Sequence, residues 1–263
     1  MGATGSEGAG KSGGRLERLG VFLFASRNWL FTAGLLGLLA GFRPVLFWHS
    51  ERADTWMNLF GLGLTLAGQG LRMAVIGYSP VWSGGTRKRV DAEQLLTTGL
   101  FAHVRNPLYI GNLLVVVGLA AIHNNPWVYG VGVPLTLLGY SAIVAAEEGY
   151  LLRRFGPDYG AYCRQVPRWV PRLRGLTQSL AGISFDGRRV VLQEYGSVYI
   201  ALALPLALML YEHLSGVYGP VSRGEVGVIA GLLAAATLAW GYLRRVKLRE
   251  VARRKQAKLA EAT

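Results

Sequence analysis

The sequence predicts an all-α fold, a polytopic transmembrane helix bundle of about six spans with a cytoplasmic pocket closed by a short helix after span four. Hydrophobic residues make up 51% of the chain and charged residues only 16%, whereas soluble globular proteins carry roughly 25% charged residues. Several apolar stretches approach the length of about 20 residues that a membrane span needs. Lys and Arg gather in alternate loops between these stretches, which is typical of an integral, multi-pass membrane protein.

Six stretches qualify as spans, and each has its own features. Arg43-Pro44 interrupts the first, and Pro205 predicts a kink in the fifth. The third is short, so we expect it to tilt or to have a wet end. Arg72 lies inside the second, where it either pairs with a glutamate near residue 147 or snorkels to the membrane edge. The six are residues 29–48, 56–78, 107–122, 127–146, 195–211 and 225–242.

The basic residues predict the orientation of the bundle. Of the 28 Lys and Arg residues, 24 fall in the N-terminal tail, the loop after span two, the segment after span four and the C-terminal tail. Because such residues accumulate on the cytoplasmic side, the alternation predicts an even number of spans with both termini cytoplasmic.

Composition also excludes several classes of protein. The net charge of +13 would suit a nucleic-acid partner, but the apolar stretches assign it to membrane topology, so we expect membrane lipids and no nucleic acid. Cys163 is the only cysteine, which excludes a disulfide framework and a cysteine-based zinc site. We predict no metal site, and the sequence does not indicate the oligomeric state.

These features divide the chain into five predicted parts. Residues 1–28 form a flexible basic tail, and 29–78 hold spans one and two. Residues 79–174 form a core with spans three and four and the pocket. A linker with spans five and six follows at 175–243, and a basic cytoplasmic tail at 244–263.

The first chemically informative motif precedes span three. Asn106-Pro107 has the residue types of a helix start, since Asn is a favoured N-cap and Pro is favoured at the first helical position. That motif is either a plain helix start or part of an anion site. His103 and Arg105 lie just before the positive end of this helix, where they favour a carboxylate.

A second motif, Glu147-Glu148, closes span four. Two adjacent carboxylates at the end of an apolar span are costly to bury. They are either solvated at the interface and paired with Arg153 and Arg154, or at least one points into the bundle and meets a cation. Arg105 and Arg168 are the cations expected on the same side.

The segment after the glutamates contains a break and a short amphipathic stretch. Phe155-Gly156-Pro157 predicts that the helix ends there. Tyr159 and Tyr162 then lie on one face of a short helix. This helix either lies in the membrane interface or folds back as a lid over the site.

Together these motifs resemble the integral-membrane methyltransferase superfamily of isoprenylcysteine carboxyl methyltransferases and phospholipid N-methyltransferases. The resemblance is strong over roughly 75 residues and weak before them. The sequence departs from the family's pattern at Asn106, where the family often has His, and at 101–103; these departures bear on the acceptor more than on the donor. The matching pieces are Thr98-Gly99, Val104-Arg105-Asn106-Pro107-x-Tyr109-x-Gly111, Glu147-Glu148, Phe155-Gly156-x-x-Tyr159-x-x-Tyr162 and Val166-Pro167-Arg168-Trp169-Val170-Pro171.

The resemblance implies a membrane enzyme that moves a methyl group from S-adenosylmethionine to a lipid or prenylated acceptor, an isoprenylcysteine carboxylate or a phospholipid amine, that enters from the bilayer. The expected catalytic residues are Glu148, Arg105 and Arg168. The expected cofactor-binding residues are His103, Val104, Arg105, Asn106, Tyr109, Glu147, Glu148, Tyr159 and Tyr162.

Two alternatives remain at this point. One is a nicotinamide-dependent sterol-type reductase with a similar core. The other is a non-catalytic haem-binding membrane protein, for which His49, His123 and His213 are expected on one side of the membrane.

Overall fold

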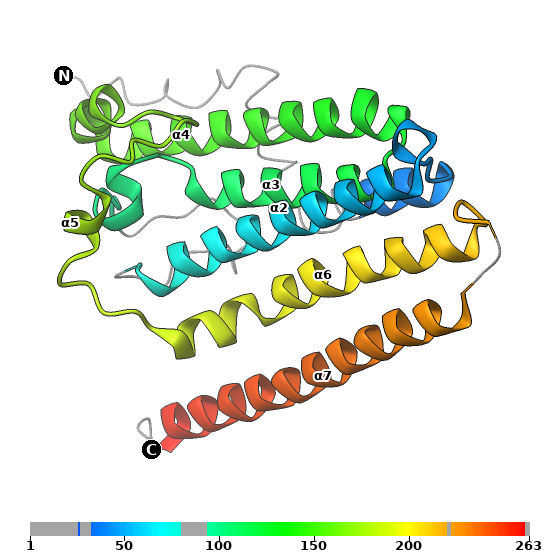
Figure 1. Cartoon of the computed structure of the whole chain (residues 1–263). Coiled ribbons are helices and arrows are strands. Elements are labelled where there is room, and N and C mark those ends of the chain that lie inside the picture. Colours follow the sequence, from blue (N-terminus) through cyan, green and yellow to red (C-terminus); the bar gives the residue numbers. More distant parts are fainter. Residues whose placement is uncertain (1–25, 27–32, 80–93, 220–221, 261–263) are drawn as a thin grey trace, which may run out of the picture.

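The structure, a computed structural model, describes residue 26 and residues 33–79, 94–219 and 222–260. Over these ranges the regular elements are all helical, and the long helices run side by side (Figure 1). The prediction of an all-α membrane bundle is therefore confirmed. The elements are η1 Phe47–His49, α2 Glu51–Gly77, η2 Gly99–Ala102, α3 Pro107–His123, η3 Val128–Gly132, α4 Val133–Gln165, α5 Leu176–Leu180, α6 Gly187–Leu214 and α7 Arg223–Ala260.

Within the described ranges, four helices are long and apolar enough to cross a membrane, namely Glu51–Gly77, Val128–Gln165, Gly187–Leu214 and Arg223–Arg253. With 17 residues, α3 is shorter and spans about 26 Å at 1.5 Å per residue. Of the first expected span, residues 33–41 are helical, and the chain then leaves the helix before Pro44. Residues 29–32 and nearly all of the expected N-terminal tail lie outside the described ranges. A count of six spans stays a prediction.

Helices α2 and α3 are packed backbone to backbone through glycines. Gly61 and Gly68 on α2 face Gly118 and Gly111 on α3, respectively. The two glycines of each helix are two helical turns apart. A Cβ added to Gly68 would lie 2.5 Å from the Gly111 carbonyl oxygen, and one on Gly118 would lie 2.5 Å from the Gly61 carbonyl oxygen. Small residues permit this close approach of membrane helices. The pair forms a rigid support for the start of α3.

Helix α4 bends at Gly156 instead of ending there. Gly156 has φ 51° and ψ −124°, a backbone conformation that glycine adopts without a Cβ penalty. Pro157 then occupies the first turn of the new direction, where its missing N–H costs nothing. The short helix expected after the break is therefore present as the last turns of α4, up to Gln165.

Helix α6 is joined to α2 by a buried ion pair. Arg72 donates from Nε and Nη2 to the two carboxylate oxygens of Glu194, at 2.9 and 2.8 Å, and Gln69 Nε2 donates to Glu194 at 3.2 Å. The prediction that Arg72 pairs with a glutamate near residue 147 is therefore wrong. In Figure 1 α6 lies next to α2, whereas α4 lies beyond α3, so the carboxylate of α6 meets Arg72 first.

A second group of polar contacts connects α2 and α6 at the opposite end of the bundle. Asp54 and Glu212 are buried, and Asn58 Nδ2 donates to Glu212 at 2.9 Å. Tyr218, after α6, donates its hydroxyl proton to Asp54. Burial, followed by this bond, raises the pKa of the Tyr218 hydroxyl well above its usual range.

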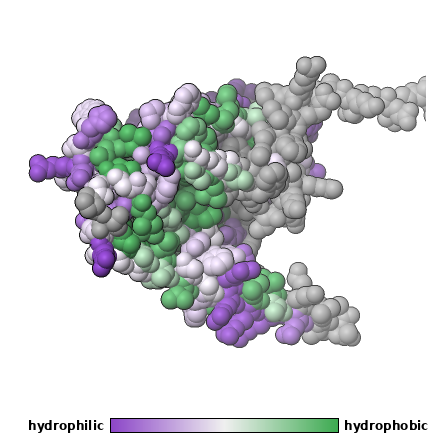
Figure 2. Space-filling view, turned by 90° about the vertical axis from the view of Figure 1, so that its right-hand side faces the viewer, coloured by the Kyte–Doolittle hydropathy of each residue, from purple (hydrophilic) through white to green (hydrophobic). Residues whose placement is uncertain are grey.

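The outermost helix, α7, lies beside α6 (Figure 1). None of the residues in its most apolar stretch is buried, as expected of a helix that faces lipid. Figure 2 looks along the helices from the end where α2 begins and shows hydrophobic side chains on the outside of the bundle. Trp56, Leu138 and Leu238 are among the exposed apolar residues.

Candidate functional site

The site lies where the end of α4 meets the start of α3, at the end of the bundle where α2 ends and α6 begins (Figure 1). Asn106 holds the N-cap position of α3, followed by Pro107, but its side chain does not cap the helix. Instead, Asn106 Nδ2 donates to the Arg168 carbonyl at 3.2 Å. The residue thus joins the helix start to the segment that follows α4.

Glu148 is the centre of the site. It accepts from Arg105 Nη1 at 2.8 Å and from Arg168 Nε at 3.1 Å, and Arg168 Nη2 binds its second oxygen. The hydrogen bond to Glu148 raises the pKa of the Arg168 guanidinium. Two cations from separate segments therefore converge on one carboxylate, as the sequence predicted for the glutamate doublet.

Glu147 points to a different partner. Tyr109 donates its hydroxyl proton to Glu147 Oε1 at 2.8 Å, and the Tyr109 ring packs against Tyr140 with centroids 5.2 Å apart. Neighbouring residues of a helix project about 100° apart. The two carboxylates therefore divide, with Glu148 towards the arginines and Glu147 towards Tyr109.

Arg105 has further neighbours that the sequence did not predict. Its Nη1 lies 3.2 Å from Cys163 Sγ, and its backbone N–H donates to the Pro167 carbonyl at 2.9 Å. Its Nε is buried, with no hydrogen-bond partner among the described residues. A buried donor without a partner is costly, so this atom is suited to an acceptor group of a ligand.

Three expected cofactor residues are packed inside the protein. Val104, Tyr159 and Tyr162 are all buried. Tyr162 donates to the Phe101 carbonyl at 2.8 Å, and the two tyrosine rings contact each other with centroids 6.0 Å apart. Their contact with a cofactor stays a prediction.

His103 is also buried, and both of its ring nitrogens are engaged. Nδ1 lies within hydrogen-bond distance of the Arg172 carbonyl, and Nε2 lies 2.8 Å from Ser179 Oγ. In this arrangement neither nitrogen is open to a ligand carboxylate. Arg172 and Ser179 belong to no motif, and no pattern in the sequence indicated that His103 would reach them.

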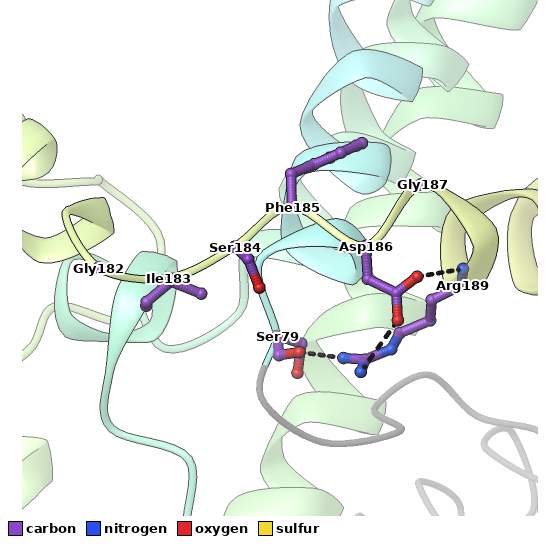
Figure 3. Close-up of a pocket in the computed structure, with 8 residues that line it drawn as sticks. All are labelled: Ser79, Gly182, Ile183, Ser184, Phe185, Asp186, Gly187 and Arg189. Atoms are coloured by element: carbon purple, nitrogen blue, oxygen red, sulfur yellow. Dashed lines mark hydrogen bonds and ion pairs between the residues drawn. The ribbon is translucent and has the colours of Figure 1, made fainter.

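A cavity of about 600 Å³ opens nearby, but the charged cluster does not line it. It lies between Ser79, two residues after α2, and the loop that leads into α6 (Figure 3). Its arginine, Arg189, contacts the Asp186 carboxylate at 3.3 Å and donates to the Ser79 carbonyl. The lining residues are Ser79, Gly182, Ile183, Ser184, Phe185, Asp186, Gly187 and Arg189.

Comparisons with known proteins find relatives over the region that holds most of this site. The family model described as phospholipid methyltransferase matches residues 56–158, which include Arg105, Tyr109 and both glutamates. The human protein-S-isoprenylcysteine O-methyltransferase is 27% identical over 143 residues, covering 51% of this chain and 48% of its own. The protein-S-isoprenylcysteine O-methyltransferase B of Arabidopsis thaliana is 28% identical over 142 residues, covering 53% of this chain and 72% of its own.

A further relative carries a different kind of name. The nickel-cobalt-cadmium resistance protein NccN of Alcaligenes xylosoxydans xylosoxydans is 31% identical over 125 residues, covering 48% of this chain and 56% of its own. The chain thus spans about half the length of the first curated relatives that it matches. No solved structure matches the chain. These matches show that the central part of this chain is similar to phospholipid methyltransferases and to protein-S-isoprenylcysteine O-methyltransferases.

Proposed function

We propose that this protein is an S-adenosylmethionine-dependent methyltransferase of the membrane that acts on a lipid or prenylated acceptor. One observation carries the proposal: Glu148 holds Arg105 and Arg168 from two other segments, and Glu148 and Arg105 lie inside residues 56–158, which match the methyltransferase family model. Clusters of paired charges in a largely apolar protein are typical of functional sites.

The residues present fit the donor. When bound, S-adenosylmethionine supplies a methyl carbon on a positively charged sulfur, which an acceptor oxygen or nitrogen displaces in line. Arg105, with its buried and unpartnered Nε, would hold the donor's carboxylate. Glu147, which accepts a hydrogen bond from the Tyr109 hydroxyl, would hold its ammonium.

The chain's own contribution to the reaction is mainly alignment. Holding acceptor and donor in line removes most of the entropy cost of bringing them together. Excluding water strengthens the charge contacts that hold both groups. In the proposal, Tyr159 and Tyr162 close the cytoplasmic side, where α4 bends back at Gly156.

The arrangement favours a carboxylate acceptor over an amine. An amine must first lose a proton, and Glu148 is the expected base. However, both oxygens of Glu148 already accept hydrogen bonds from guanidinium groups. A carboxylate needs no base, and Arg168, whose side chain is 41% exposed, can orient it.

Binding and label transfer test the proposal. Purified protein in lipid nanodiscs is expected to bind S-adenosylmethionine saturably and to show no saturable NADPH binding and no Soret band on addition of haem. Membranes incubated with donor carrying a tritiated methyl group should then label a lipid or prenylated fraction, and release of the label as methanol by base would identify an ester. Absence of donor binding to folded protein would overturn the proposal.

A further inference from the structure

We propose that His103 is a positioning residue that holds residues 166–180, here called the strap, across Arg105 and Glu148. The inference rests on the proposed function, since the strap carries Arg168. The two ring nitrogens of His103 face the Arg172 carbonyl and Ser179 Oγ, so in this proposal His103 acts through the strap.

The strap is paired to the residues before α3 by backbone bonds. The Arg105 N–H donates to the Pro167 carbonyl at 2.9 Å, and the Arg172 N–H donates to the His103 carbonyl at 3.1 Å. The two segments therefore run alongside each other like a short ladder. This pairing fixes the position of Arg168 relative to Glu148.

The His103 side chain closes this ladder at its far end. A carbonyl only accepts hydrogen bonds, so the nitrogen that faces the Arg172 carbonyl, Nδ1, carries a proton. The Ser179 hydroxyl can then donate to Nε2 at 2.8 Å. One ring thus ties together two points of the strap that lie seven residues apart, the second of them in α5.

We expect the ring to have a large effect because most of residues 170–180 are exposed. The outward side of the strap is open, with Val170 75% and Leu173 72% exposed. The His103 ring, by contrast, is buried beneath it. Without the ring, we expect the strap to detach more often from the residues before α3 and to take Arg168 away from Glu148.

Cys163 provides a probe that needs no cofactor. It is the only cysteine of the chain, it is partly buried, and its sulfur lies 3.2 Å from Arg105 Nη1. Detachment of the strap should expose this thiol. The rate of its alkylation by a maleimide in the folded protein therefore reports how often the strap opens.

The variants follow from the bonds. His103→Leu removes both hydrogen bonds of the ring. If the free energy that holds the strap closed falls by about 1.4 kcal/mol, the alkylation rate should rise about tenfold. Ser179→Ala removes one bond and should give a smaller rise of about threefold. His103→Gln keeps one donor and one acceptor and should return towards the wild-type rate. His49→Leu, at the exposed opposite end, is the matched control with no change.

The same variants separate positioning from catalysis. His103→Leu should weaken donor binding about tenfold, in step with the alkylation rate. Wild-type alkylation rates in both His103→Leu and Ser179→Ala would overturn the proposal. If His103→Leu does not fold, the alkylation rate of Ser179→Ala alone tests the proposal. Because alkylation needs no donor, a protein that fails to bind S-adenosylmethionine refutes the proposed function and leaves this test intact.

Discussion

Arg105 is the residue on which most interactions of the site converge. Its side chain meets Glu148 and Cys163, its backbone meets Pro167, and its Nε has no partner among the described residues. A side chain that is held from three directions loses little further freedom when a ligand binds. This is the pre-organisation expected of a ligand-binding arginine.

Replacing either member of the central ion pair should strongly weaken donor binding. Arg105→Ala removes the proposed carboxylate partner, and Glu148→Gln leaves two guanidinium groups around a neutral amide. Charge-assisted bonds of this kind contribute about 1.5–3 kcal/mol each, so we expect a loss of 10-fold to more than 100-fold in affinity by calorimetry. Arg52→Ala, exposed at the start of α2, is the control. Unchanged affinity in both site variants would exclude this pair from the donor site.

The ion pairs of Glu194 on α6 and Glu250 on α7 differ in exposure to solvent, the first being largely buried and the second exposed. Glu194→Ala would leave Arg72, whose side chain is 18% exposed, without its carboxylate, and breaking a buried pair in this way costs about 3–5 kcal/mol. Arg188→Ala breaks the exposed pair with Glu250, which contributes about 0–1 kcal/mol. Thermal unfolding in detergent should show a large loss for the first variant and little for the second. Equal losses would show that Arg72 finds another partner.

The pairing of α2 with α3 depends on glycines at specific positions. Gly68→Ala places a methyl group 2.5 Å from the Gly111 carbonyl oxygen, so the two helices must separate. Overpacking of this kind costs about 1–3 kcal/mol. Because α3 carries the site at its start, donor affinity should fall together with the melting temperature.

Gly63→Ala is the matched control on the same helix. Nothing lies within 4 Å of the added Cβ, and alanine is favoured over glycine in a helix by about 1 kcal/mol. The melting temperature should therefore stay the same or rise. A fall equal to that of Gly68→Ala would mean that helix α2 does not pack on α3 through these positions.

The orientation of the bundle can be tested with introduced cysteines. Arg52 and Arg249 are exposed and lie at opposite ends of the bundle, since α2 begins where α7 begins (Figure 1). With Cys163→Ser as background, we expect Arg249→Cys to be cytoplasmic and Arg52→Cys to face outwards. An impermeant maleimide should label Arg52→Cys in intact cells and Arg249→Cys only after lysis. The reverse pattern would place the site outside.

Composition and charge alternation determined the class of this protein. Apolar runs of span length need internally bonded helices in lipid, and this holds whatever the helices pack against. The start of α3 at Pro107 follows from local residue types. At Gly156 local residue types predicted the end of a helix, whereas the structure has a bend within α4. The sequence also brought Arg105, Arg168 and the glutamates to one end, since loop charge predicts the side of the membrane.

Partner choice was decided only by the tertiary structure. Arg72 pairs with Glu194 and not with a glutamate of α4, because the order of helices around α2 is set by packing between distant segments. His103 faces the strap because the turn from Pro167 to Ser179 brings a carbonyl and a hydroxyl to its ring. Such contacts depend on how segments far apart in the chain fold back on each other, which local propensity and charge pattern do not encode.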